Sequence, residues 1–238
     1  MIRPIWLLKF FVAIFVLSGN VSADIILDYD VADSDLGNLS PTNVNANARA
    51  DDMAAGSGLT VKSQGPSWNW KDFNTNTNSY ADAVAANDVW TWGFDVRTVS
   101  TIDLTTMDIR LRRSNLGPSD FEIQAAVNGG SSVSLLTHNF GGSTSITDFT
   151  AIDLSSLGTL KNGDSVVFTL GAWGGSNLNA AFDLEAFVGQ SYGVRINGDV
   201  ESVPEPTTLM LLVVLGIALI ARKHYSRFLF SKGTATGK

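Results

Sequence analysis

The side chains that could do chemistry in this chain are mostly carboxylates. The 238 residues include 23 Asp and Glu, two His and no Cys. These counts exclude cysteine zinc sites, thiol nucleophiles and disulfide scaffolds, and the chain has no HExxH metalloprotease motif. A Ser-His-Asp triad would need His138, which stands near Gly141 without a nucleophile-elbow motif. We therefore expect no catalytic residues of these classes.

Two glutamates could belong to a glycosidase. Glu122 and Glu185 fall on the polar face of predicted strands. Glycosidic hydrolysis needs two carboxyl groups about 5–10 Å apart across a sugar. Glu122 with Glu185 or Asp183 could satisfy that distance, but nothing in the local sequence singles them out. We expect a protein that is not an enzyme, with a secreted glycan-active enzyme on the same fold as the alternative.

A second group of carboxylates could bind calcium, which takes six to eight oxygen ligands. An acidic segment opens the domain, and Asn38 follows it. The EF-hand pattern is not met, so the sequence leaves two readings, a solvated acidic face and a structural calcium site. The residues of that site would be Asp28, Asp30, Asp33, Asp35 and Asp183. No other cofactor is expected.

Tryptophans spaced by two could bind sugars. Residues two apart share one face of a strand, and a flat indole can stack on a sugar ring. Trp90, Trp92 and Phe94 form one apolar stripe that is typical of a buried strand face. Trp68 and Trp70 lie in a stretch rich in Gly, Pro and Asn, and they are the candidate glycan platform.

Residues 24–203 carry a strong negative charge. They hold 22 Asp and Glu against 9 Lys and Arg, a net charge of −13. Such a segment repels phosphate backbones, so we expect no nucleic-acid partner. Arg110 and Arg112 share a strand face beside Arg113. They could meet an acidic polysaccharide, but pairing with neighbouring Asp residues is favoured.

Alternating apolar and polar residues predict an all-β domain over 24–203. About ten strands and no convincing amphipathic helix favour a two-sheet antiparallel β-sandwich of jelly-roll type. One helical turn is expected at 81–87. The predicted strands are 24–30, 59–62, 89–96, 102–104 leading into 107–113, 121–127, 132–137, 149–154, 165–171, 181–187 and 191–196.

The first 23 residues predict a signal peptide. Arg3 and Lys9 precede a short apolar run, and small residues then lead to a cleavage point between Ala23 and Asp24. Signal peptidase is the implied partner. The run is short for a permanent membrane anchor, which is the alternative.

The C-terminal segment has three parts. Pro204, Glu205 and Pro206 are followed by an apolar stretch over 207–221 and by the basic residues Arg222, Lys223 and Arg227. As a helix the stretch is about 22 Å long, against a hydrocarbon core of about 30 Å. We expect a single transmembrane helix in the precursor, with the basic cluster and the tail 228–238 on the cytoplasmic side.

This arrangement over 204–227 resembles the PEP-CTERM sorting signal. The resemblance implies processing by an exosortase and delivery to the cell surface or extracellular matrix of a bacterium that makes exopolysaccharide. A plain C-terminal anchor is the alternative.

Residues 81–88, 111–118 and 182–184 also resemble jelly-roll ectodomains that often precede such signals. That likeness implies a fold shared with many carbohydrate-binding modules and no established activity. We expect an exported, exosortase-sorted, non-catalytic surface or matrix protein that could bind polysaccharide. A structural matrix protein with no ligand remains open.

Overall fold

The computed structural model describes residues 23–31, 39–63, 67–97 and 100–202, together with 215, 216 and 218. The chain divides into two compact units, residues 1–201 and 202–238. The Pro204-Glu205-Pro206 triplet, the basic cluster at Arg222, Lys223 and Arg227, and the signal peptide before Ala23 lie outside the described residues. No helix among the described residues is long and apolar enough to span a membrane.

Residues 24–202 form two antiparallel β-sheets, which confirms the predicted all-β sandwich. The larger sheet contains nine strands: β1 (Asp24–Asp30), β2 (Pro41–Val44), β5 (Thr60–Ser63), β6 (Ser67–Lys71), β8 (Ser100–Arg113), β11 (Ser145–Asp153), β12 (Thr159–Lys161), β14 (Phe182–Glu185) and β15 (Tyr192–Ser202). The smaller sheet contains six: β3 (Ala48–Ala50), β4 (Ala54–Ala55), β7 (Val89–Val96), β9 (Asp120–Val127), β10 (Val133–Asn139) and β13 (Ser165–Trp173).

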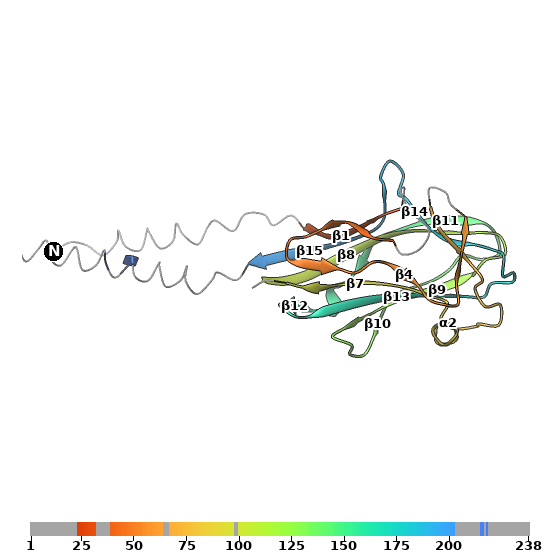
Figure 1. Ribbon diagram of the computed structural model, residues 1–238, viewed down its shortest axis with the longest axis horizontal. Helices are drawn as coiled ribbons and strands as arrows, with labels where there is room; N and C mark the ends of the chain where they lie inside the picture. The colour runs from red at the N-terminus through yellow and green to blue at the C-terminus, as the bar shows by residue number, and fades with distance from the viewer. Residues whose placement is uncertain are drawn as a thin grey trace, which may run out of the picture. The chain divides into compact units, whose positions relative to one another are not determined.

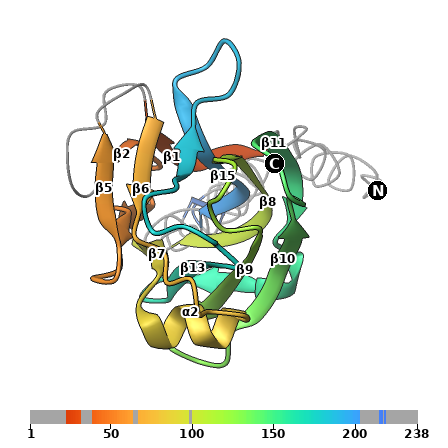
Figure 2. The same cartoon turned by 90° about the vertical axis from the view of Figure 1, so that its right-hand side faces the viewer.

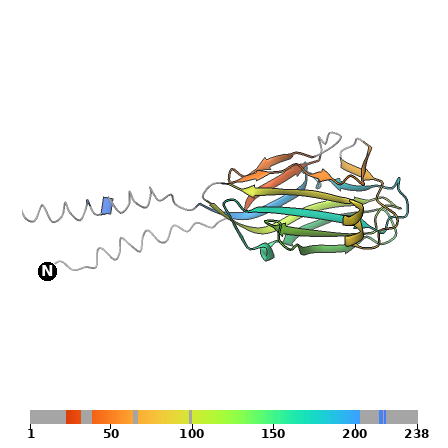
Figure 3. The same ribbon diagram turned by 60° about the horizontal axis from the view of Figure 1, so that its bottom comes forward.

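The long strand β8 organises the nine-stranded sheet. The main path of this sheet is β2-β1-β15-β8-β14-β6-β5, and β11 and β12 also pair with β8. The six-stranded sheet follows β10-β9-β13-β7-β3, with β4 beside β7. Figure 2 shows the two sheets as separate layers, and Figure 3 shows the long strands running along the sandwich.

The first and last strands of the domain lie side by side. Asp24 pairs with Gly198 and Asp28 with Arg195, so β1 and β15 run antiparallel (Figure 1). The start of β1 and the end of β15 therefore lie at the same end of the nine-stranded sheet.

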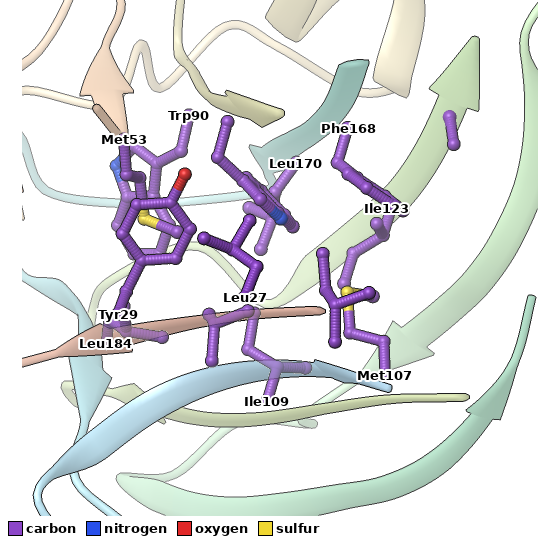
Figure 4. Packing of buried hydrophobic residues seen from close by; sticks show 14 of the residues in the cluster. Leu27, Tyr29, Met53, Trp90, Met107, Ile109, Ile123, Phe168, Leu170 and Leu184 are labelled. Carbon is purple, nitrogen blue, oxygen red and sulfur yellow. The ribbon is translucent and has the colours of Figure 1, made fainter. Parts of the chain in front are cut away.

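The core between the sheets is built from the apolar side of each strand, because alternate residues point to opposite faces. Trp90, Trp92 and Phe94 of β7 are all buried, as the sequence predicts. The ring of Trp92 stacks on that of Phe168, with centroids 5.6 Å apart. Figure 4 shows Trp90 and Leu170 from the six-stranded sheet facing Leu27, Ile109 and Leu184 from the other. Burial of each such side chain contributes about 1.5–3 kcal/mol.

One short helix, α2 (Tyr80–Ala86), lies against the outer side of the six-stranded sheet (Figure 2). It begins at Ser79, whose hydroxyl accepts a hydrogen bond from the backbone N–H of Asp82. It ends at Asn87, which adopts a left-handed conformation at φ 63°. This helix confirms the predicted turn at 81–87, and it positions Tyr80 over the sheet.

Candidate functional site

The predicted glycan platform at Trp68 and Trp70 is wrong, because both indoles are buried. Their exposed fractions are 3% and 7%. They belong to β6, and the Trp68 ring lies 5.0 Å from Trp70 and 5.2 Å from Trp90. The Gly, Pro and Asn residues around them suggested a loop, whereas the chain forms a strand that turns both indoles into the core. A buried indole has no face to offer a sugar.

The acidic residues of the predicted calcium site are engaged elsewhere where the structure describes them. Both carboxylate oxygens of Asp28 accept hydrogen bonds from Arg195, at 2.7 and 3.0 Å. Asp183 accepts one from Nε of Arg112 at 2.6 Å. In the described ranges no three acidic or histidine side chains are grouped to hold a metal ion. Asp28 and Asp183 thus do not fit a calcium site.

The structure describes one further residue of the predicted calcium set. Asp30 is the half-buried last residue of β1. Asp33, Asp35 and Asn38 lie outside the described residues.

The arginines of β8 pair with acidic neighbours, as the sequence analysis favoured. Arg110 lies 3.1 Å from Asp148 of β11. Arg112 lies 2.6 Å from Asp183 and 2.9 Å from Glu185 of β14. These ion pairs line the outer face of the nine-stranded sheet, where they neutralise the arginines and make binding of an acidic polymer there unfavourable.

Arg113 points the other way and has a structural role. It is 4% exposed, and its guanidinium donates to the backbone carbonyls of Gly117, Gly141 and Ser143 at 2.6–3.0 Å. Burial lowers its pKa, and the nearby Asp120 carboxylate opposes that change. The side chain ties together the β8–β9 and β10–β11 loops.

The proposed carboxylate pair does not converge. Phe121 and Ile123 of β9 lie in the core, so Glu122 between them points out of the six-stranded sheet. Phe182 and Leu184 of β14 also lie in the core, so Asp183 belongs to the outer face of the nine-stranded sheet. Since packed sheets lie about 10 Å apart, Glu122 cannot face Asp183 or Glu185 across one sugar.

His138 lies in an aromatic cluster. Its ring centroid is 4.9 Å from those of Phe140 and Phe149 and 5.8 Å from that of Phe121. Burial lowers its pKa, and Asp120 partly opposes this. These contacts assign His138 a structural role, which is to pack against the neighbouring aromatic rings.

An aromatic site that the sequence analysis missed lies on the outer face of the six-stranded sheet. In β13, Phe168, Leu170 and Ala172 are buried, while Thr169 and Trp173 alternate with them and are partly exposed. Trp173 is thus the one tryptophan of β6, β7 and β13 that is not in the core. The sequence could have predicted this exposure, because in the alternation of β13 Trp173 falls on the side opposite Phe168 and Leu170.

Tyr80 of α2 covers the middle of this face. Its ring packs on Gly171, where a Cβ atom would come within 2.9 Å of it. Its side chain is hydrogen-bonded with Thr169. Burial and the Glu122 carboxylate raise its pKa, and the bond with Thr169 opposes this rise. Gly171 therefore has a specific role, since a larger residue there would push Tyr80 away from the sheet.

Polar side chains of β9 continue the face. Glu122 pairs in register with Gly171, and Gln124 with Thr169. Gln124 donates to Glu122 at 2.9 Å and accepts from Ser132 at 2.7 Å, so both β9 side chains are held in place. We call the surface formed by Trp173, Tyr80, Thr169, Glu122 and Gln124 the aromatic face. It combines ring surfaces with fixed hydrogen-bonding groups, which is the chemistry that sugar recognition requires.

No protein-family model and no curated protein matches the sequence. Among solved structures the chain is similar to the C-terminal domain of a chitobiase from Bacteroides fragilis (9% identity, TM-score 0.31), covering 66% of this chain and 97% of that one. It is also similar to a variant of CBM29-2, a family 29 carbohydrate-binding module (11%, 0.27), covering 76% and 91%. The β-(1,4)-mannanase GH26-CBM35 from Podospora anserina (15%, 0.30) is matched over 74% of this chain and 28% of its own. Scores of this size carry no argument about function, so the site rests on its own geometry.

Proposed function

We propose that residues 24–203 form a non-catalytic module that binds polysaccharide through the aromatic face. The observation that carries this proposal is the outward position of Trp173 beside Tyr80, on a sheet face whose polar side chains are already oriented. The four other tryptophans of the domain, Trp68, Trp70, Trp90 and Trp92, are buried in the core. Packing therefore accounts for those four and leaves the exposure of Trp173 to be explained by a ligand.

A catalytic role for this face is the alternative, because Asp120 and Glu122 are two apart on one strand. Asp120 accepts from Asn139 and from Ser119, both at 2.5 Å, and Glu122 accepts from Gln124. These hydrogen bonds hold both carboxylates against neighbouring side chains of the domain, which supports a binding role over hydrolysis.

We expect Trp173→Ala to weaken oligosaccharide binding by about two- to twelvefold, since an aromatic contact contributes about 0.5–1.5 kcal/mol. Calorimetry with a panel of neutral and charged oligosaccharides on residues 24–203 measures the effect. Tyr192→Ala is the matched control, because Tyr192 is a partly exposed aromatic residue of β15 in the other sheet. Unchanged affinity in Trp173→Ala, or release of reducing ends by the wild type, would contradict the proposal.

We also propose that the protein is exported and sorted by an exosortase to the cell surface or matrix. The support is the order of Pro204, Glu205 and Pro206, the apolar stretch 207–221 and the basic cluster that follows it. The last strand, β15, ends at Ser202, so the triplet begins two residues beyond the sheet. A processing enzyme could act there without unpairing a strand.

Replacing both Pro204 and Pro206 with Ala should leave an uncleaved precursor in the membrane, because it removes the prolines that favour an extended segment before the apolar stretch 207–221. The measurement is gel mobility and the membrane-to-medium ratio in a host that has an exosortase. A variant with Thr207 and Thr208 changed to Ala is the control for two substitutions in the same segment. If the proline variant and wild type have the same mobility and the same ratio, the segment is a simple anchor.

A further inference from the structure

The Glu122 carboxylate of the aromatic face has no ion-pair partner among the described residues. Glu122 accepts a hydrogen bond from the neutral amide of Gln124, and Asp120 accepts from Asn139 and Ser119. Asp120 lies at the Trp173 end of the face, where it pairs in register with Trp173. Asp120 also acts electrostatically on Arg113 and His138, so the negative charge of this surface that lacks a cationic neighbour is that of Glu122.

Lys and Arg are scarce in the six-stranded sheet. Its strands and α2 contain one Lys or Arg, which is Arg49 of β3, and that residue is ion-paired with Asp95. The nine-stranded sheet differs, because Arg110, Arg112 and Arg195 each pair with an acidic side chain. Glu122, on the face that carries Trp173 and Tyr80, thus lacks an arginine partner of the kind that Asp148, Asp183 and Asp28 have.

Aromatic rings beside carboxylates attract ammonium groups. The ring quadrupole attracts a cation over its face, and a carboxylate a few ångströms away adds a Coulomb attraction that partial burial strengthens. The same charges repel the carboxylates of uronic acids. Burial and, after it, the Glu122 carboxylate raise the pKa of Tyr80, which is consistent with a negative charge close to its ring.

We infer that the aromatic face selects polysaccharides that carry free amino groups. This inference rests on the proposed function, in which sugar rings stack on Trp173 and Tyr80. An ammonium group on the sugar would lie near Glu122 or Asp120, while an uncharged sugar would keep the ring contacts alone.

Three oligosaccharides of equal length test this inference: a glucosamine oligomer, its N-acetylated counterpart and an oligouronate. Binding to residues 24–203 is measured at about pH 6. We expect the free-amine oligomer to bind about fivefold more tightly than the N-acetylated one, and this preference to shrink between about 0.1 M and 1 M salt.

Two substitutions separate the charge from the ring contacts. Glu122→Gln should reduce the preference for the free amine while leaving affinity for the N-acetylated oligomer within about twofold. Glu201→Gln makes the same change of charge at an exposed position of β15 and should alter neither affinity. Trp173→Ala should weaken binding of both oligomers.

The results separate the preference for free amines from the proposed binding of polysaccharide. Equal binding of the two oligomers, or tighter binding of the oligouronate, overturns the amine preference and leaves polysaccharide binding standing. An undiminished preference in Glu122→Gln also overturns it. Failure of all three oligosaccharides to bind overturns both.

Discussion

Replacing Arg112 with Met is expected to lower the free energy of unfolding by about 3–5 kcal/mol, because the change leaves a buried carboxylate without its cation. Asp183 has an exposed fraction of 0%, and its Oδ2 lies 2.6 Å from Nε of Arg112. Glu185 shares the same guanidinium at 2.9 Å. Met keeps most of the length and apolar packing of the arginine side chain, so the loss reports charge. Urea unfolding of residues 24–203 measures it.

Arg110→Met is the matched control, two residues away on the same strand face. Its partner Asp148 has a side chain that is 47% exposed, so water can solvate that carboxylate when the arginine is removed. We expect a loss below about 1 kcal/mol. A second substitution, Asp183→Asn in the Arg112→Met background, should recover part of the stability by removing the buried charge. Equal losses in the two Met variants would contradict this account.

Trp90→Ala should also be strongly destabilising, by about 3–5 kcal/mol. Trp90 is 1% exposed, and its ring lies 5.2 Å from Trp68 and 5.3 Å from Phe182, so it joins both sheets. Its indole Nε1 is buried without a hydrogen-bond partner among the described residues. Trp90→Phe should therefore cost less than its lost volume suggests, since it removes an unpartnered donor.

The measurement is the unfolding midpoint and slope in guanidinium chloride for Trp90→Ala, Trp90→Phe and Trp173→Ala. Trp173 is partly exposed, so its removal should cost clearly less than that of Trp90. A loss in Trp173→Ala as large as that in Trp90→Ala would mean that Trp173 is also a core residue, and the proposed sugar contact would lose its support.

Residue alternation predicted the fold class well, because period two is a local property of each strand. It identified the stripe of Trp90, Trp92 and Phe94 and most of the longer strands. It failed for β6, where two tryptophans stand between Gly, Pro and Asn residues that are usually found in loops. Local composition outweighed the alternation there, and the short strands β2, β3 and β4 were missed because they contain too few residues to show a period.

The candidate site was less accessible to sequence reasoning. Trp173 could have been found from its position opposite Phe168 and Leu170. The packing of Tyr80 on Gly171 depends on where α2 returns to the sheet, which no local pattern specifies. The pairing of Asp28 with Arg195 joins residues at opposite ends of the domain, and the acidic cluster looked metal-binding because its arginine partner could not be recognised.

The pairing of β1 with β15 also sets the order in which the domain can be completed. A chain that crosses a membrane from its N-terminus delivers β15 last, yet β15 lies between β1 and β8 in the nine-stranded sheet. Until it arrives, β1 and β8 each leave an edge unpaired, and unpaired edges invite association with other chains. The final pairing spans nearly the whole domain, and such non-local contacts form slowly. Pro204 follows β15 by two residues, so the segment that we propose to be processed would emerge just as the sheet becomes able to close. Cleavage before that point would release a domain whose strand edges are still unpaired.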